Sequence, residues 1–118
     1  MHQNVCSIRN KVEKLEVFLL SSEVKFNVLC LTEHFLCNDE VDLLRVAGYY
    51  AASSYSRQER THGGAILLTK IGISCCERVD IVNLSVEGCC KVAAAEVKKL
   101  NLVIVVVYRP LKVIMLYF

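Results

Sequence analysis

The chain has 118 residues, of which 54% are hydrophobic and 22% are charged, and its net charge at pH 7 is +2. This length suits one small domain, and the large apolar fraction with a single proline excludes a disordered chain. The nearly balanced charge excludes a broad basic surface that binds nucleic acid by charge alone, so a nucleic-acid role needs a specific site. We therefore expect residues 1–118 to form one domain or part of one.

The chain contains seven cysteines, at positions 6, 30, 37, 75, 76, 89 and 90. Their odd number, the two adjacent pairs and the lack of a secretory signal favour a reducing intracellular location, nuclear or cytoplasmic. Adjacent cysteines lack the C-x-x-C spacing that brings two thiolates to one zinc ion. We expect these cysteines to be buried small hydrophobic residues and not zinc ligands.

The first third of the chain predicts helix, strand and short helix. Four apolar residues recur at helical spacing, namely Ile8, Val12, Leu15 and Leu19. They predict an amphipathic helix that begins near Asn10. The apolar run "FNVLCLTE" then has the length of a buried strand, and "NDEVDLLRVAGYY" predicts one or two helical turns that end at Gly48.

From Tyr49 onward the pattern predicts short strands. Five extended segments follow one another: "YYAASSY", "GAILLTK", "GISCCE", "VAAAEVKK" and "LNLVIVVVY". The charged, glycine-bearing "RQERTHGG" suits a hairpin connection between the first two, and "KKLN" suits a tight turn between the last two. The β-branched run at 103–107 predicts a buried strand that ends at Arg109 and Pro110.

The last nineteen residues of the chain, 100–118, are mostly apolar and are long enough to span a bilayer. Arg109 and Lys112 would lie near the middle of such a span, where each costs about 2.5 to 3.5 kcal/mol. Pro110 would also break the helix. We therefore expect no membrane-spanning segment and no membrane partner.

Four motifs in this order resemble a known family. "HQNVCSIRNKVEKLEVFL", "VLCLTEHFL", "VAGYYAASSYSRQERTHGGAILL" and "VIVVVYRP" are similar to the endonuclease domain of non-LTR retrotransposons, a member of the endonuclease/exonuclease/phosphatase family. The resemblance spans residues 2 to about 110. It implies an α/β (α+β) fold, a four-layered α/β sandwich of two facing sheets between helices, and Mg²⁺-dependent hydrolysis of phosphodiester bonds in DNA.

The resemblance also implies site residues. The asparagine of "HQN" is Asn4, which would help to hold metal and phosphate, and the glutamate of "TEH" is Glu33, which would bind the metal. The tyrosine of "YRP" is Tyr108, which would contact the phosphate. These roles fit the chemistry, because Mg²⁺ takes only one or two protein carboxylates and phosphate oxygens complete its shell. His34 and His62 are expected at the surface or in turns rather than as ligands.

Later motifs of the family are absent. The "GDxN" and "SDH" motifs, which position the attacking water and neutralise the phosphate, would follow "YRP", and the aspartates here are Asp39, Asp42 and Asp80. We therefore expect an incomplete sandwich, the N-terminal half of the domain, that is inactive alone and binds Mg²⁺ weakly.

Two alternatives stand beside this fragment of a DNA endonuclease. One is a non-catalytic interaction module whose exposed sheet edges pair with another chain, and the other is an inert product of a degenerate element. The strand that ends at Tyr108 is expected to leave such an edge open, because only "LKVIMLYF" follows "YRP". Self-association through terminal strands is the expected consequence.

Overall fold

Two four-stranded sheets and three α-helices make up the part of the chain that the computed structural model describes, residues 1–56, 63–86, 89–109 and 112–117. The strands are β1 (His2–Asn4), β2 (Val28–Thr32), β3 (Tyr49–Tyr55), β4 (Ala65–Lys70), β5 (Cys76–Glu77), β6 (Lys91–Val97), β7 (Leu102–Arg109) and β8 (Lys112–Tyr117). The helices are α1 (Val12–Ser21), α2 (Asn38–Leu43) and α3 (Val79–Val82), with a 3-10 turn at Lys98–Leu100. The fold is therefore mixed α+β.

The first sheet has the strand order β1-β2-β4-β3. β1 and β2 run parallel, with α1 in the connection between them, and β4 runs antiparallel to both of its neighbours. Asn4 is the register partner of Thr32. Because parallel strands place their carboxyl ends at one edge of a sheet, the residues that follow β1 and β2 emerge side by side.

The second sheet has the order β5-β6-β7-β8 and is antiparallel throughout. Asn101 closes the turn between β6 and β7 in the left-handed conformation, with φ of 50°, which asparagine tolerates better than most residues. In the register of this pair Lys91, at the start of β6, lies opposite Tyr108, near the end of β7. These two side chains therefore share one end of the sheet.

The two sheets pack against each other through small and branched side chains. The residues of this cluster are Cys30, Ala65, Leu67, Ala93, Ala95, Val97, Ile104 and Val106. Alternation along β6 places Lys91 on the same face as Ala93 and Ala95, so its side chain also points between the sheets. The alanines allow the two sheets to approach closely at this face.

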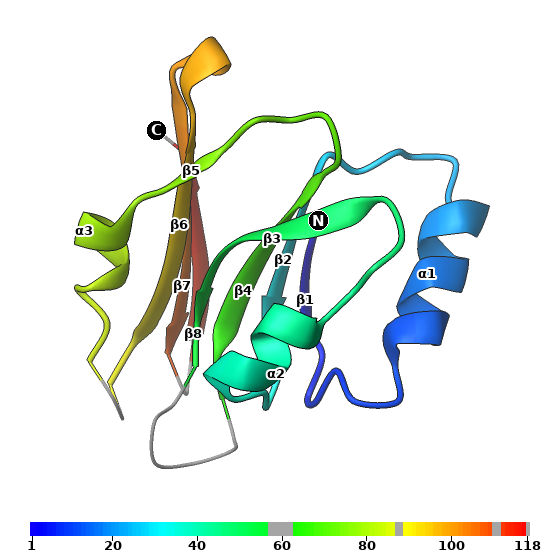
Figure 1. Cartoon of the computed structure of the whole chain (residues 1–118). Coiled ribbons are helices and arrows are strands. Elements are labelled where there is room, and N and C mark those ends of the chain that lie inside the picture. The colour runs from blue at the N-terminus through cyan, green and yellow to red at the C-terminus, as the bar shows by residue number, and fades with distance from the viewer. Residues whose placement is uncertain (57–62, 87–88, 110–111, 118) are drawn as a thin grey trace.

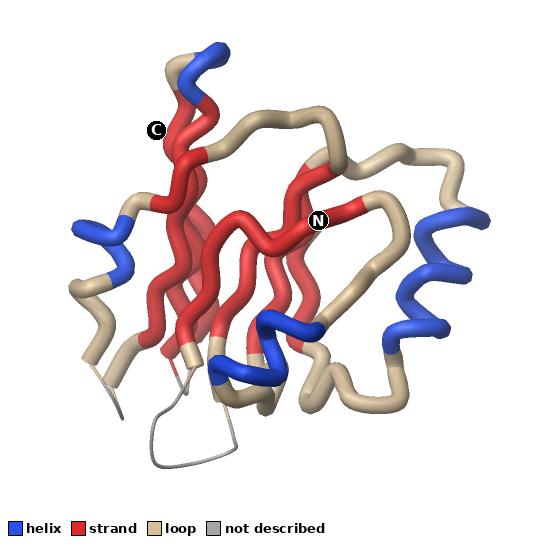
Figure 2. Tube along the Cα trace, in the orientation of Figure 1, coloured by secondary structure: helices blue, strands red, loops and turns tan. Residues whose placement is uncertain are grey.

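Helices cover both outer faces (Figure 1). Val12, Leu15 and Leu19 of α1 and Val41 of α2 pack on the outer face of the first sheet. α3 packs through Ile81 and Val82 on the outer face of the second, and the strands lie between the helices (Figure 2). The apolar stripe that predicted the first helix is the stripe that packs.

The structure confirms the strands expected from the sequence and moves several boundaries. The first helix begins at Val12 and not near Asn10, because Asn10 has φ of 61°, outside the helical region. α2 ends at Leu43, and Gly48, with φ of 85°, instead lies in the turn before β3. The "GISCCE" segment contributes only the two residues of β5.

Two further expectations are wrong. Of the seven cysteines only Cys30 is buried, because it alone lies in the middle of a central strand. The strand that ends near Tyr108 does not leave an open edge, because residues 112–117 form β8 and pair along it from Ile104 to Arg109. On this side of the sheet the outer strand is therefore β8 and not β7.

No helix within the described ranges is long and apolar enough to cross a membrane.

Candidate functional site

Three residues singled out by the motifs lie at the same end of the two sheets. Asn4 is the last residue of β1, Glu33 directly follows β2, and Tyr108 is the penultimate residue of β7. Asn4 pairs in register with Thr32, the residue before Glu33. The parallel pairing of β1 and β2 accounts for the first two, and the packing of the sheets brings Tyr108 to them.

The Tyr108 hydroxyl donates a hydrogen bond to the Glu33 carboxylate at Oε1. Tyr108 is only 7% exposed, and Glu33 is half-buried. The two residues come from different sheets, so this bond joins the sheets at one end. A hydrogen bond to an ionised carboxylate is stronger than a neutral one, particularly where water is partly excluded.

The Asn4 side chain contacts the loop that follows β1. Its side chain is exposed, and its Oδ1 accepts a hydrogen bond from the Cys6 backbone N–H at 3.2 Å. The amide oxygen is therefore engaged with the following loop. Asn4 therefore lies at the strand end adjacent to Glu33, with its amide oxygen bonded to the loop after β1.

Lys91 is a fourth polar residue at this end. It is 0% exposed, and its Nζ lies 5.3 Å from the centre of the Tyr108 ring. This is the geometry of a cation–π contact, and burial increases the strength of such contacts. Because Tyr108 also bonds Glu33, the ammonium, the ring and the carboxylate form one continuous polar group, called here the Lys91–Tyr108–Glu33 group.

The backbone that carries Glu33 is held on both sides. The Glu33 N–H donates to the Gly64 carbonyl at 2.8 Å, and its carbonyl accepts from the Ser7 N–H at 2.8 Å. Glu33 and Phe35 have φ of 57° and 62°, a conformation that costs non-glycine residues of order 1 kcal/mol or more. The flanking hydrogen bonds hold the segment in this conformation and so fix where the carboxylate emerges.

His34 is a structural residue and not a surface one. It is 0% exposed, its Nδ1 accepts from the Leu36 N–H at 2.9 Å, and its Nε2 lies 3.1 Å from the Tyr55 carbonyl oxygen. The accepting Nδ1 and the facing carbonyl assign the neutral ring with the proton on Nε2. Burial lowers the pKa of His34 below its usual value. Both nitrogens are used, so His34 is not a metal ligand. His62 lies outside the described residues.

Gly64 is required beside this histidine. A Cβ at Gly64 would lie 2.3 Å from the His34 Nε2, and the φ of Gly64 is +94°. Both the contact and the backbone conformation exclude a larger residue. Gly64 therefore packs on the ring, and through its carbonyl it also holds Glu33.

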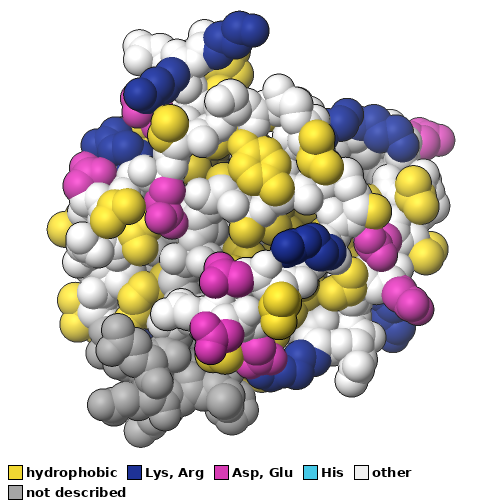
Figure 3. Space-filling model, in the orientation of Figure 1, with side chains coloured by type: hydrophobic (Ala, Val, Ile, Leu, Met, Phe, Trp, Pro, Cys, Tyr) yellow, Lys and Arg dark blue, Asp and Glu magenta, His cyan; other side chains and the backbone are white. Residues whose placement is uncertain are grey.

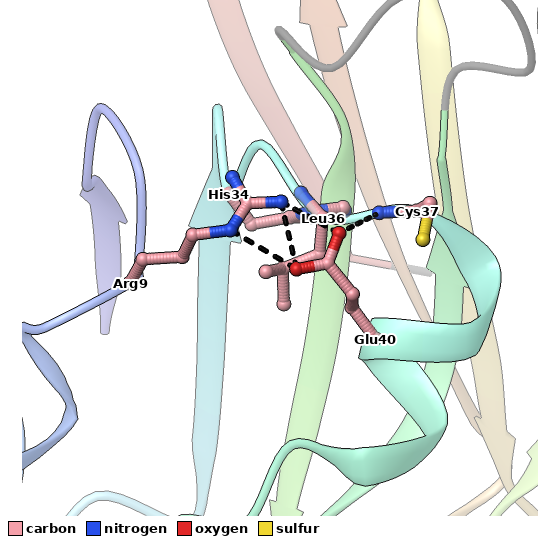
Figure 4. A network of polar contacts seen from close by, with 5 residues as sticks. All are labelled: Arg9, His34, Leu36, Cys37 and Glu40. Carbon is pink, nitrogen blue, oxygen red and sulfur yellow. Dashed lines mark hydrogen bonds and ion pairs between the residues drawn. The ribbon is translucent and has the colours of Figure 1, made fainter.

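An ion pair between Arg9 and Glu40 lies beside the segment that follows β2 (Figure 4). Arg9 donates to both carboxylate oxygens of Glu40, with Nη2 2.6 Å from Oε1 and Nε 3.0 Å from Oε2. The same carboxylate accepts from the Cys37 N–H at the start of α2. The Arg9 guanidinium lowers the pKa of Glu40. This pair joins the loop after β1 to the helix that follows the Glu33 segment.

The oxygen atoms of Glu33 and Asn4 already accept hydrogen bonds within the chain. The Tyr108 hydroxyl donates to Glu33 Oε1, the Cys6 N–H donates to the Asn4 oxygen, and the Lys91 ammonium lies over the Tyr108 ring. Within the described ranges no three His, Cys, Asp or Glu side chains converge into a metal-binding group. Water and substrate oxygens would complete the shell of a Mg²⁺ ion held by Glu33.

Sequence reasoning missed Lys91 and misjudged His34. The sequence did contain a signal for Lys91. A lysine begins the apolar segment "KVAAAEV", and the alternation of side chains along a strand places it on the same face as the buried alanines. No pattern marked His34, because its burial depends on Gly64 and on β3, which are distant in sequence.

The surface carries mixed charge over the face drawn in Figure 3, with lysine and arginine interspersed among aspartate and glutamate. This agrees with the small net charge and offers no basic stripe on that face. Comparison of the chain with protein-family models, with curated proteins and with solved structures finds no match.

Proposed function

We propose that this chain is the N-terminal part of an endonuclease domain of the endonuclease/exonuclease/phosphatase type, from a non-LTR retrotransposon. In this proposal the substrate of the complete domain is DNA, its cofactor is Mg²⁺, and its location is intracellular. The fold is then an incomplete four-layered sandwich, for which the facing sheets and the outer helices provide support.

The observation that carries the proposal is the contact between Glu33 and Tyr108. The motifs "TEH" and "YRP" assigned these residues to one site, although they lie 75 positions apart in the sequence. Asn4 of "HQN" ends the neighbouring strand. A chance resemblance of separate motifs gives no reason for the three to gather at one end of the molecule.

The chemistry of the chain alone falls short of hydrolysis. The Glu33 carboxylate, through a metal ion, and the Tyr108 phenol can orient a phosphodiester. A second group must position or deprotonate the attacking water, and the motifs that do this in the family are absent. We therefore propose that the chain alone is inactive.

The test uses the whole chain with and without a C-terminal half that carries "GDxN" and "SDH", co-expressed from a domain of the resembled family. Nicking of supercoiled DNA with Mg²⁺ is expected only when both halves are present, and Glu33→Gln should abolish it. The exposed Glu13→Gln serves as the control and should leave nicking unchanged. Absence of nicking by the two halves, or Glu33-dependent nicking by the chain alone, contradicts the proposal.

The flanking genomic sequence offers an independent test. Translation in all frames is expected to reveal the "GDxN" and "SDH" motifs and a reverse-transcriptase frame downstream. A flanking region without these features contradicts the assignment to a retrotransposon.

A non-catalytic interaction module is the second candidate. Within the described residues, β1 is an outer strand of the first sheet and β8 is an outer strand of the second. Each of them pairs with one strand. Such edges can pair with another chain. We propose self-association through them, with size-exclusion chromatography and light scattering as the measurement. A monomer at all concentrations up to tens of micromolar contradicts this candidate.

A further inference from the structure

Lys91 stands out among the residues of the candidate site because the motifs assign it no role. Its ammonium is fully buried, at the end of the inter-sheet space where Tyr108 meets Glu33. A buried ammonium is costly unless negative charge or polar groups compensate it. Such a residue fixes the electrostatic character of the space around it.

We propose that Lys91 is a built-in counter-cation for Glu33 that opposes the binding of divalent metal ions at this carboxylate. The inference rests on the proposed function in one respect, namely that Glu33 occupies a metal-binding position. It predicts that the natural chain binds divalent ions only weakly at Glu33.

The geometry provides two ways for Lys91 to act. Its positive charge lies over the Tyr108 ring, whose hydroxyl bonds the Glu33 carboxylate, so a divalent ion at Glu33 meets repulsion from a buried ammonium. The ammonium over the Tyr108 ring also draws electron density from the phenol, which makes the hydroxyl a stronger donor to Glu33. Both effects favour the internal hydrogen bond over an external cation.

The position of Lys91 is set by the sheet and not by a flexible loop. It is the first residue of β6 and lies opposite Tyr108 in the register of β6 and β7. Its neighbours on the same face, Ala93 and Ala95, are completely buried against the first sheet. The ammonium therefore cannot move to the surface without disturbing the packing between the sheets, and its charge stays at the site.

The test measures Mn²⁺ binding to the whole chain, by the paramagnetic resonance signal of free Mn²⁺, without any activity assay. Lys91→Met is expected to bind Mn²⁺ at least about tenfold more tightly than the natural chain, because a unit charge several ångströms from a divalent ion is worth more than this. Lys91→Arg, which keeps the charge, should bind like the natural chain. The exposed Lys14→Met is the matched control and should change affinity less than twofold.

A double variant locates the ion. In Lys91→Met with Glu33→Gln, the gain in affinity should disappear. Lys91→Gln removes the same charge but keeps hydrogen-bonding groups, and it replaces Lys91→Met if circular dichroism shows that the methionine variant is unfolded. An unchanged affinity in the folded neutral variant, or a gain that survives Glu33→Gln, overturns the inference.

The outcome is separable from that of the proposed function. A lysine with a purely structural role would change the stability of the chain and leave its Mn²⁺ affinity unchanged. If the two halves fail to nick DNA while Lys91→Met gains affinity through Glu33, the nuclease assignment fails and the role of Lys91 stands. If the two halves nick DNA while Lys91→Met gains no Mn²⁺ affinity, the nuclease assignment stands and the role of Lys91 fails.

Discussion

A hydrogen bond from the Tyr108 hydroxyl to the Glu33 carboxylate connects the two sheets, although the two residues lie 75 positions apart. Tyr108 belongs to β7 of the second sheet, and Glu33 follows β2 of the first. The bond closes one end of the apolar space between the sheets, next to the buried ammonium of Lys91. It has therefore a structural effect whether or not the site acts on a substrate.

Tyr108→Phe should destabilise the chain by about 1.5 to 3 kcal/mol, the usual range for a hydrogen bond to a charged group. The ring and its packing are kept, so the change reports on the hydroxyl. Urea denaturation measures the loss as a lower midpoint. Tyr50→Phe is the matched control, since the Tyr50 hydroxyl bonds the Ile73 carbonyl on an exposed surface. Equal losses in the two variants would contradict a special role for the bond between the sheets.

The stability of the fold should decrease as the pH falls below about 6.5. Burial lowers the pKa of His34 from its ordinary value of 6.5, so the folded state holds the ring neutral while the unfolded chain takes up a proton. The contribution of neutral His34 to the free energy of unfolding is fully present above the pKa of the unfolded chain. It is lost as the pH falls from there through the lower pKa of the folded state. The slope for one such histidine is at most about 1.4 kcal/mol per pH unit.

Unfolding by urea at several pH values between 5 and 8 measures this slope. His2 also has a lowered pKa, through burial and the nearby N-terminal charge, and it contributes in the same direction. His2→Gln should remove only its own share of the pH dependence. If His2→Gln removes all of the dependence, His34 does not titrate as its burial predicts.

Cys30 should resist alkylation while the chain is folded. Burial raises the pKa of its thiol to about 11, and its side chain is only 1% exposed. Since the thiolate is the reactive form, iodoacetamide at neutral pH should modify the exposed Cys6 and Cys37 and leave Cys30 unmodified until urea is added. Mass spectrometry of the digested chain identifies the sites. Rapid labelling of Cys30 without denaturant would contradict its place in the core.

Local patterns predicted most elements of the fold, because each depends on nearby residues. The stripe of α1 and the apolar runs of β2, β4, β6 and β7 are periodic over single segments. The ends of the helices were less predictable. Asn10 has the left-handed conformation, so α1 can begin only after it. That conformation depends on how the loop after β1 packs.

The site was predictable only in part, for a similar reason. Glu33 and Tyr108 came from motifs, and their meeting depends on the packing of one sheet on the other. Lys91 and His34 owe their burial to partners far away in the sequence. The role of residues 112–117 also escaped prediction, because a short apolar end gives no sign of whether it pairs with the preceding strand.

Val105 of β7 would face solvent if α3 did not cover the second sheet. In the structure Val105 is 5% exposed and packs with Val92 and Ala94 beneath Ile81 and Val82 of α3. Val105→Lys places an ammonium in this cluster, where it has to be desolvated or has to displace the short helix. We expect a loss of about 2 to 4 kcal/mol in the free energy of unfolding and a smaller soluble fraction.

Val79→Lys is the matched control for Val105→Lys, because the same exchange is made on α3 at a side chain that is 54% exposed. A surface substitution of this kind should change stability by less than about 0.5 kcal/mol. The two variants are compared by urea denaturation and by the soluble fraction after expression at equal temperature. A larger soluble fraction for Val105→Lys with an unchanged midpoint would mean that this face of β7 is open to solvent. Because Ile81 and Val82 are what cover it, that result would overturn the packing of α3 on the second sheet.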